Sequence, residues 1–222
     1  MKKVICTFIL MAVTFIVLAD SLDEKIDSFW RYISQNENKI LSAKQTDQEL
    51  YTDLYDEIQK INNNLSVFLE NNIVNGRKNI IISANSNPDY FKLCDEIVTR
   101  APKFEVINPV SLIPPLEVIE PFIYGDIKFS ADDVRVHFDK DDKKVDLFFF
   151  LTNEHTNRIK IDKSGQMYDI YMQMLYIMTQ QILGERKTGE RIGSGEIILM
   201  SLLMPTVPFI DIGNIIEDNY GE

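Results

Sequence analysis

The sequence predicts a single α+β domain in which an antiparallel or mixed sheet, built from hairpins, is backed by helices. Two pairs of short strand-like runs each flank a turn signal, and amphipathic helical stretches stand before and after them. Strands and helices do not alternate in the regular order of a βαβ fold. We place the domain at residues 20–222, because no repeat, low-complexity segment or linker composition divides that part of the chain.

Helices are expected in the first half of this domain. Apolar residues at helical spacing predict an amphipathic helix over residues 22–41. A second helix is expected to begin with the capping box Thr46-Asp47-Gln48-Glu49 and to end before residues 62–64, a run of asparagines. A shorter helix is expected over residues 87–100, with proline at its first position. Residues 104–123 contain several prolines and predict at most a short or edge strand.

Two hairpins are predicted. The first joins residues 65–70 to residues 78–84 through Asn75-Gly76, a dipeptide suited to the positive φ angles of a tight turn. The second joins residues 134–138 to residues 145–151 through a loop of charged residues. Each pair is expected to be antiparallel.

The most apolar helix is predicted over residues 168–183 and is expected to be the central helix of the core. Gly184 is suited to end it with a left-handed backbone. The segment Gly184–Glu190 lacks the lysine and hydroxyl residue of a phosphate loop, so it is interpreted as a connection between helix and strand. A last strand is expected over residues 197–203, and the tail after Pro205 is expected to be a loosely packed loop.

The first 19 residues have the pattern of an export signal. Two lysines at the start precede an uncharged apolar run over residues 4–19. This run is shorter than the roughly 20 residues that span a bilayer, so we predict a signal peptide cleaved after Ala19, with an uncleaved membrane anchor as the alternative. Because Cys6 lies inside this segment, Cys94 is the only thiol of the mature chain, and it is expected to be a small core residue.

The chain is acidic, with a net charge of −11. Removal of the first 19 residues would take away two lysines and no acid, which makes the net charge −13. Such a field repels phosphate backbones, so we predict no nucleic-acid binding, and membrane contact only through an uncleaved N-terminal segment. The same charge favours encounter with a basic protein partner.

No catalytic constellation is apparent, and we assign no catalytic residue and no cofactor. The only histidines are His137 and His155, and no serine lies in a Gly-x-Ser-x-Gly motif. A calcium loop of the EF-hand type beginning at Asp139 would need glycine and glutamate where Lys144 and Phe150 stand, so a solvated hairpin turn is the favoured interpretation. The weak candidates for metal ligands are Asp139, Asp141, Asp142, Glu154 and His155.

Aromatic residues on the helices are the remaining indication of a binding surface. Tyrosine and tryptophan often anchor interfaces, although packing at the edge of the core is the favoured role here. The residues concerned are Trp30, Tyr32, Tyr51 and Tyr55 on the first two helices and Tyr168, Tyr171 and Tyr176 on the last.

A series of short motifs follows one another along the chain: Phe29-Trp30, Asn36-Glu37, Ile82-Ser83-Ala84, Arg100-Ala101-Pro102, Asp133-Val134, Leu183-Gly184-Glu185 and Ile192-Gly193. In the order and spacing of these motifs, the chain resembles a family of bacterial proteins of unknown function over nearly its whole mature length. It departs from that pattern at Asn85-Ser86, where the family often has Asp-Gly, and at Gln180, where the family often has an acid. The resemblance implies a single α+β domain and no particular activity.

These observations lead to three hypotheses about function. The leading one is an exported, periplasmic or cell-envelope module that is not an enzyme and binds a protein partner, in one form an immunity-like protein that masks a basic toxin. The alternative is a carboxylate- or metal-dependent hydrolase of the cell envelope. A small-molecule binding module is the third, and it would require an apolar pocket.

Overall fold

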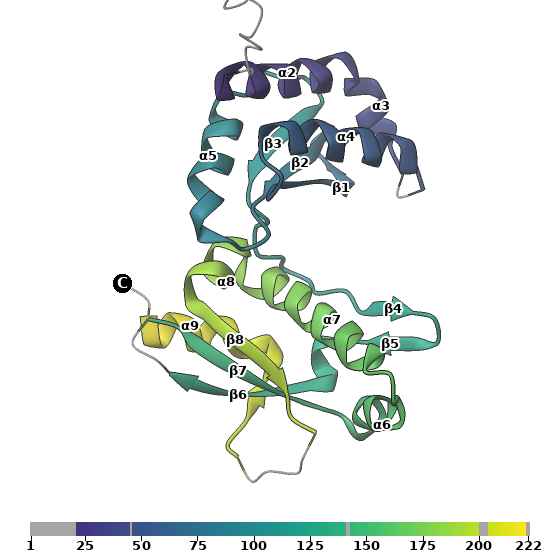
Figure 1. Ribbon diagram of the computed structural model, residues 1–222, viewed down its shortest axis with the longest axis vertical. Coiled ribbons are helices and arrows are strands. Elements are labelled where there is room, and N and C mark those ends of the chain that lie inside the picture. Colours follow the sequence, from purple (N-terminus) through teal and green to yellow (C-terminus); the bar gives the residue numbers. More distant parts are fainter. Residues whose placement is uncertain (1–20, 45, 141–142, 200–203, 221–222) are drawn as a thin grey trace, which may run out of the picture.

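The computed structural model describes residues 21–44, 46–140, 143–199 and 204–220, and it confirms the predicted α+β class. The described residues form two lobes, which are joined along one side of the molecule and separate on the other (Figure 1). Each lobe has its own cluster of buried apolar residues, one ending at Leu112 and the other beginning at Ile127. The residues between them include Pro114-Pro115 and cross from one lobe to the other.

The first lobe is a three-stranded sheet covered on one face by helices (Figure 1). Strands β1 and β2 are antiparallel, and β3 runs parallel to β2. Leu69 and Ile80 pair across β1 and β2 and lie in the helix-covered core, whereas Phe68 and Ile81 pair on the opposite face. Its elements are α2 (Leu22–Gln35), α3 (Glu37–Ser42), α4 (Gln48–Ile61), β1 (Ser66–Val74), β2 (Arg77–Ser83), η1 (Pro88–Tyr90), α5 (Phe91–Thr99) and β3 (Ile107–Ser111).

The second lobe contains a four-stranded mixed sheet in the order β8-β7-β6-β9 and a small hairpin of β4 and β5. Helix α7 lies on one face of the larger sheet and contributes Tyr171, Leu175 and Met178 to the core. Its elements are β4 (Phe122–Tyr124), β5 (Ile127–Phe129), η2 (Ala131–Asp133), β6 (Val134–Lys140), β7 (Val145–Leu151), α6 (Asn153–Ile161), α7 (Gln166–Leu183), α8 (Glu185–Arg191), β8 (Ile192–Ile197), β9 (Val207–Pro208), η3 (Phe209–Asp211) and α9 (Ile212–Tyr220).

Both predicted hairpins and the central helix are confirmed. Asn75 and Gly76 have φ angles of 53° and 76°, as the predicted turn between β1 and β2 requires. Strands β6 and β7 pair antiparallel over their whole length. Gly184 ends α7 with a φ of 78°, although its ψ of 157° is extended and lies outside the left-handed helical region.

Three predictions about helices are wrong. The helix expected over residues 22–41 is interrupted at Asn36, whose side chain donates to the Tyr32 carbonyl and ends α2. The capping box expected at Thr46 is not formed, because α4 begins at Gln48 and the Asp47 carboxylate instead accepts the backbone N–H of Lys44. The segment after Gly184, expected to be a simple connection, forms the short helix α8.

The C-terminal predictions are also corrected. A strand was expected over residues 197–203, but β8 begins at Ile192 and ends at Ile197, and residues 198 and 199 are not in a strand. Residues 200–203 of that prediction lie outside the described residues. The tail was expected to be a loosely packed loop, but residues 207–220 form β9, η3 and α9, and Phe209, Ile212 and Ile216 are buried in the second core. Residues 1–19, with the predicted signal and Cys6, lie outside the described residues. No helix within the described ranges is long and apolar enough to cross a membrane.

Candidate binding cleft between the lobes

The Glu185 side chain joins the two lobes. It has no exposed surface. Its Oε1 accepts hydrogen bonds from Ser83 Oγ at 3.0 Å, from the Ala84 backbone N–H at 2.8 Å and from the Ser86 backbone N–H at 3.0 Å, while its Oε2 accepts from the Ile113 backbone N–H at 2.9 Å. Four donors on one buried carboxylate offset the loss of its hydration, so Glu185 acts as a clamp between the end of β2 and the start of α8.

Close packing of α8 against the first lobe surrounds this clamp. A Cβ on Gly189 would lie 2.4 Å from the Ser86 carbonyl oxygen and 2.7 Å from the Phe91 ring, so only glycine fits there. Arg186 pairs with Asp95 at 2.9 Å and lies over the Phe91 ring, 5.2 Å from its centre. The lobes are therefore held together by charge, hydrogen bonding and backbone contact at one side.

Two further hydrogen bonds reach from α7 to the loop after β2. Tyr176 Oη donates to the Asn85 carbonyl at 2.9 Å, and Gln180 Nε2 donates to Ser86 Oγ at 2.8 Å. Asn85 and Ser86 have φ angles of 53° and 57°. This left-handed backbone favours glycine and asparagine, so Ser86 adopts a conformation that is uncommon for its residue type.

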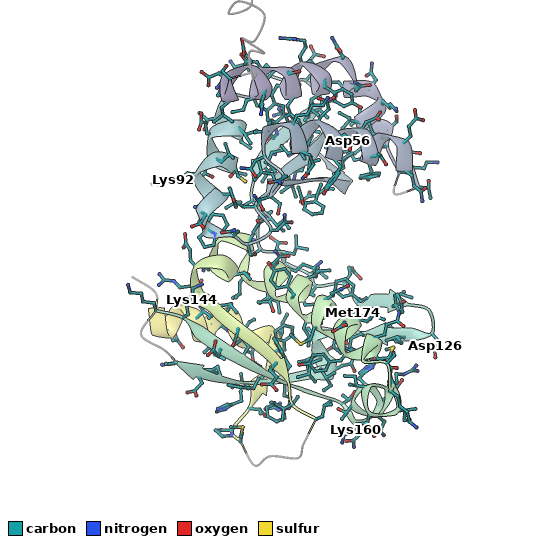
Figure 2. The ribbon with its side chains drawn as sticks, in the orientation of Figure 1. Asp56, Lys92, Asp126, Lys144, Lys160 and Met174 are labelled. Carbon is teal, nitrogen blue, oxygen red and sulfur yellow. The ribbon has the colours of Figure 1, made fainter. Side chains whose placement is uncertain are left out.

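An apolar cleft opens beside this junction, between α7 and the sheet face that the first-lobe helices leave uncovered. Its volume is about 410 Å³. Figure 2 shows α7, on which Met174 is labelled, along the side of the second lobe that faces the first. Phe68 and Ile177 are 43% and 40% exposed, so the cleft is open to solvent. The apolar side chains that line it are Phe68, Ile81, Ile113, Leu116, Tyr176 and Ile177.

Polar residues also line the cleft, namely Glu70, Ser83, Asn85, Gln180 and Gln181. Glu70 is the only charged residue among the described residues that line it. Its Oε2 accepts a hydrogen bond from Asn79 Nδ2 at 2.8 Å, and Asn79 Oδ1 accepts from Asn108 Nδ2 at 2.7 Å, so a ladder of side chains across the three strands orients this carboxylate. Gln181 Oε1 is buried without a hydrogen-bond partner, the one such side-chain atom within the described ranges.

The candidate metal ligands Glu154 and His155 are adjacent in sequence but face different surroundings. Glu154 is exposed and pairs with Arg158 at 3.4 Å. His155 is buried, with Nδ1 2.7 Å from Tyr171 Oη and Nε2 3.7 Å from an Asp133 carboxylate oxygen. The structure therefore places His155 in the core of the second lobe, in hydrogen-bonding contact with another buried side chain.

The acidic hairpin candidates are only partly described. Asp139 on β6 lies opposite Asp146 on β7, and Asp146 accepts a hydrogen bond from Ser194 Oγ at 2.8 Å. Asp141 and Asp142 lie outside the described residues. Among the residues that the structure does describe, no group of three or more histidine, cysteine, aspartate or glutamate side chains is arranged to hold a metal ion.

The structure separates the aromatic candidates by burial: Tyr32, Tyr51 and Tyr168 are partly buried at the edges of the cores, and the other four divide into buried and exposed residues. Trp30 and Tyr171 are buried, and Trp30 Nε1 donates to the Ile97 carbonyl. Tyr55 on α4 and Tyr176 on α7 are 50% and 44% exposed. Of the tyrosines expected on the helices, Tyr176 is the one that lines the cleft.

Cys94 is fully buried in the first core. Burial raises the pKa of its thiol to about 12, and the nearby carboxylates of Glu185 and Asp95 act in the same direction. The thiolate that a nucleophile requires is thus strongly disfavoured, in agreement with a packing role.

The junction was not predicted from the sequence, although two of the motifs quoted for the family resemblance meet there. Ser83 and Ala84 belong to one motif and Glu185 to the other, and they are in direct contact. Fold and cleft together define a two-lobed α+β protein with an apolar site between its lobes. No family model, curated protein or solved structure matches the chain. The resemblance to a bacterial family therefore stays a prediction.

Proposed function

We propose that this chain is an exported binding protein, not an enzyme, that holds an apolar segment of a basic protein partner in the cleft between its lobes. The observation that carries the proposal is an apolar cleft with walls from both lobes. It lies beside the Glu185 clamp, which fixes how the lobes meet. Export is supported by the basic and apolar pattern of residues 1–19.

The exposure of the cleft favours a protein partner over a small molecule. Its volume of about 410 Å³ lies within the range of ligand sites. However, Phe68, Leu116, Tyr176 and Ile177 each keep at least 40% of their surface exposed. A protein surface would cover these side chains together, whereas a small ligand would leave part of them in water.

Charge supports a basic partner. The chain has a net charge of −11, and Glu70 is the charged group in the described lining of the cleft. A partner with lysine or arginine beside its apolar residues would be attracted at long range and paired at short range. An immunity-like protein that masks a basic toxin is one form of this proposal.

The hydrolase alternative gains no support from the arrangement of its candidate residues. Glu154 faces solvent while His155 is held in the core, so the two do not converge on one site. A catalytic pair needs both groups within reach of the same reacting atom.

A pair of matched substitutions tests the proposal. The wild-type chain is used to recover its partner from an envelope extract at low salt, and the affinity of the purified partner is then measured for Ile177→Glu and Ile161→Glu. Ile177 lines the cleft, whereas Ile161 is 78% exposed at the end of α6. We expect at least a tenfold loss with Ile177→Glu and none with Ile161→Glu. Equal affinity for both variants, or no stoichiometric basic partner, would contradict the proposal.

A further inference from the structure

The two edges of the first-lobe sheet differ in how their backbone groups are satisfied. On the β3 edge, the Arg77 guanidinium donates to the Ile107 carbonyl at 2.6 Å and 3.2 Å, and Pro109 has no N–H to offer. Both features prevent another strand from pairing there. The β3 edge is thus closed to strand addition.

The opposite edge of the sheet belongs to β1. The hydrogen bonds that β2 makes to β3 show which backbone groups of β1 face away from the sheet. The Lys78 N–H donates to the Val106 carbonyl, and the Ile82 carbonyl accepts from the Leu112 N–H, so alternate β2 residues beginning with Lys78 face β3. Ile81 lies between two of these and therefore faces β1.

Because Ile81 pairs with Phe68, the backbone groups of Phe68 face β2, and those of Val67 and Leu69 face away from the sheet. Within the part of the chain that the structure describes, no hydrogen bond joins these outward groups of Val67 and Leu69. At the start of β1, the Leu65 carbonyl accepts from Gln59 Nε2 at 2.6 Å, and the Leu65 N–H donates to the Asn62 carbonyl at 3.2 Å. An open edge of this kind is a template for another strand.

The open edge borders the cleft. Phe68 and Glu70 are two residues apart on β1, so they lie on the same face of the sheet, and both line the cleft. A strand added beside β1 would place every second side chain on that face. Apolar side chains would then lie beside Phe68, and a positive charge would lie beside Glu70.

We infer that the partner segment binds as an extended strand along the free edge of β1, where it hydrogen-bonds to the backbone of Val67 and Leu69. Its alternate residues are apolar and enter the cleft, with a lysine or arginine opposite Glu70. This inference rests on the proposed binding function and names the kind of segment that the cleft takes.

The probe for this inference is a nine-residue peptide selected by the full chain from a randomised display library. We expect selected peptides to alternate apolar residues and to carry lysine or arginine, and to lose binding at least tenfold to Ile177→Glu. In hydrogen exchange followed by NMR, the amides of Val67 and Leu69 should slow at least tenfold when the peptide binds. The Phe68 amide faces β2 and serves as the internal control, because its exchange should not change.

N-methylated versions of the same peptide give a second readout. Methylation of the alternate amides that face β1 should weaken binding at least tenfold, whereas methylation of the other set should not. If binding is sensitive to Ile177→Glu but neither amide slows and both methylated sets bind alike, strand addition is wrong and the proposed function stands. If no selected peptide is sensitive to Ile177→Glu, both proposals fail.

Discussion

The Glu185 carboxylate accepts a hydrogen bond from the Ser83 hydroxyl at 3.0 Å, across 102 residues of sequence. Three backbone N–H groups complete its shell, and no surface of Glu185 reaches solvent. A buried charge with this many donors is stable only in one arrangement, so the contact specifies how the lobes meet. The two walls of the cleft belong to different lobes. The geometry of this junction therefore sets how the walls face each other, and with it the shape of the proposed binding site.

Loss of the clamp should be costly. Glu185→Ala leaves one hydroxyl and three backbone N–H groups of the lobe junction without an acceptor, and each buried unsatisfied group costs about 1–3 kcal/mol. We expect the free energy of unfolding in urea to fall by at least about 3 kcal/mol. Glu190→Ala, at an exposed position of the same helix, is the control and should change it by less than about 0.5 kcal/mol. Equal effects of the two substitutions would show that the clamp does not hold the lobes.

The close packing of α8 at Gly189 should not tolerate a side chain. A Cβ at this position would overlap the Ser86 carbonyl oxygen, which is backbone and has little room to move. Gly189→Ala is expected to lower the free energy of unfolding by about 2 kcal/mol or more. Gly213→Ala is the control, because a Cβ there meets no atom closer than 4.0 Å, and it should be neutral or stabilise by up to about 1 kcal/mol. A stable Gly189→Ala protein would contradict the described packing of α8.

The unpartnered oxygen of Gln181 should destabilise the free protein. Gln181→Met removes this buried acceptor and keeps the length of the side chain, so we expect thermal unfolding to show a gain of about 1 kcal/mol. Gln173→Met, at an exposed position of α7, is the matched control and should give no gain. A loss of stability with Gln181→Met would mean that the oxygen has a partner in solution, such as a bound water.

Alkaline pH should destabilise the first lobe through Tyr32. Burial, together with the carboxylate of Asp53 and the hydrogen bond to it, raises the pKa of Tyr32 to about 12. The unfolded chain ionises this phenol near pH 10, so the stabilisation is complete below about pH 10 and is lost as the pH rises toward 12. Tyr32→Phe should therefore make the fall in the free energy of unfolding less steep in that window.

The quantity to measure is the difference in the free energy of unfolding between wild type and Tyr32→Phe, determined by urea unfolding at several pH values. Burial lowers the pKa of Lys78, and this shift makes the free energy of unfolding rise with pH in both proteins. Burial raises the pKa of Tyr171, and this shift makes the free energy of unfolding fall with pH in both proteins. The difference between wild type and Tyr32→Phe should be constant from pH 7 to 9 and change only above about pH 10. A constant difference up to pH 12 would contradict the role of Tyr32.

Sequence reasoning succeeded where the signal is local. The Asn75-Gly76 turn sets the register of β1 and β2, and the apolar repeat of α7 marks its buried face without any knowledge of the rest of the fold. The ordered C-terminal helix was missed because its apolar residues are few, and they become buried only when the second core exists to receive them.

The cleft was beyond local reasoning. Its walls come from β1, β2 and α7, which are far apart in sequence, and no periodicity marks residues that are half exposed on two different elements. Glu185 also gave no local sign of its role, because a single acid at the start of a helix is usually a surface residue that complements the helix dipole. Its burial follows only from the donors that the first lobe brings to it.

Photo-cross-linking at the cleft tests the central claim most directly. A benzophenone amino acid is introduced at Ile177, or at Ile161 as the control, and each protein is irradiated with envelope extract at low and at high salt. We predict that the Ile177 position gives one adduct with a basic protein, that the cross-linked residue lies in an extended segment of it, and that high salt reduces the yield. An adduct that forms equally from both positions, or from Ile161 alone, would contradict the assignment of the cleft as the binding site.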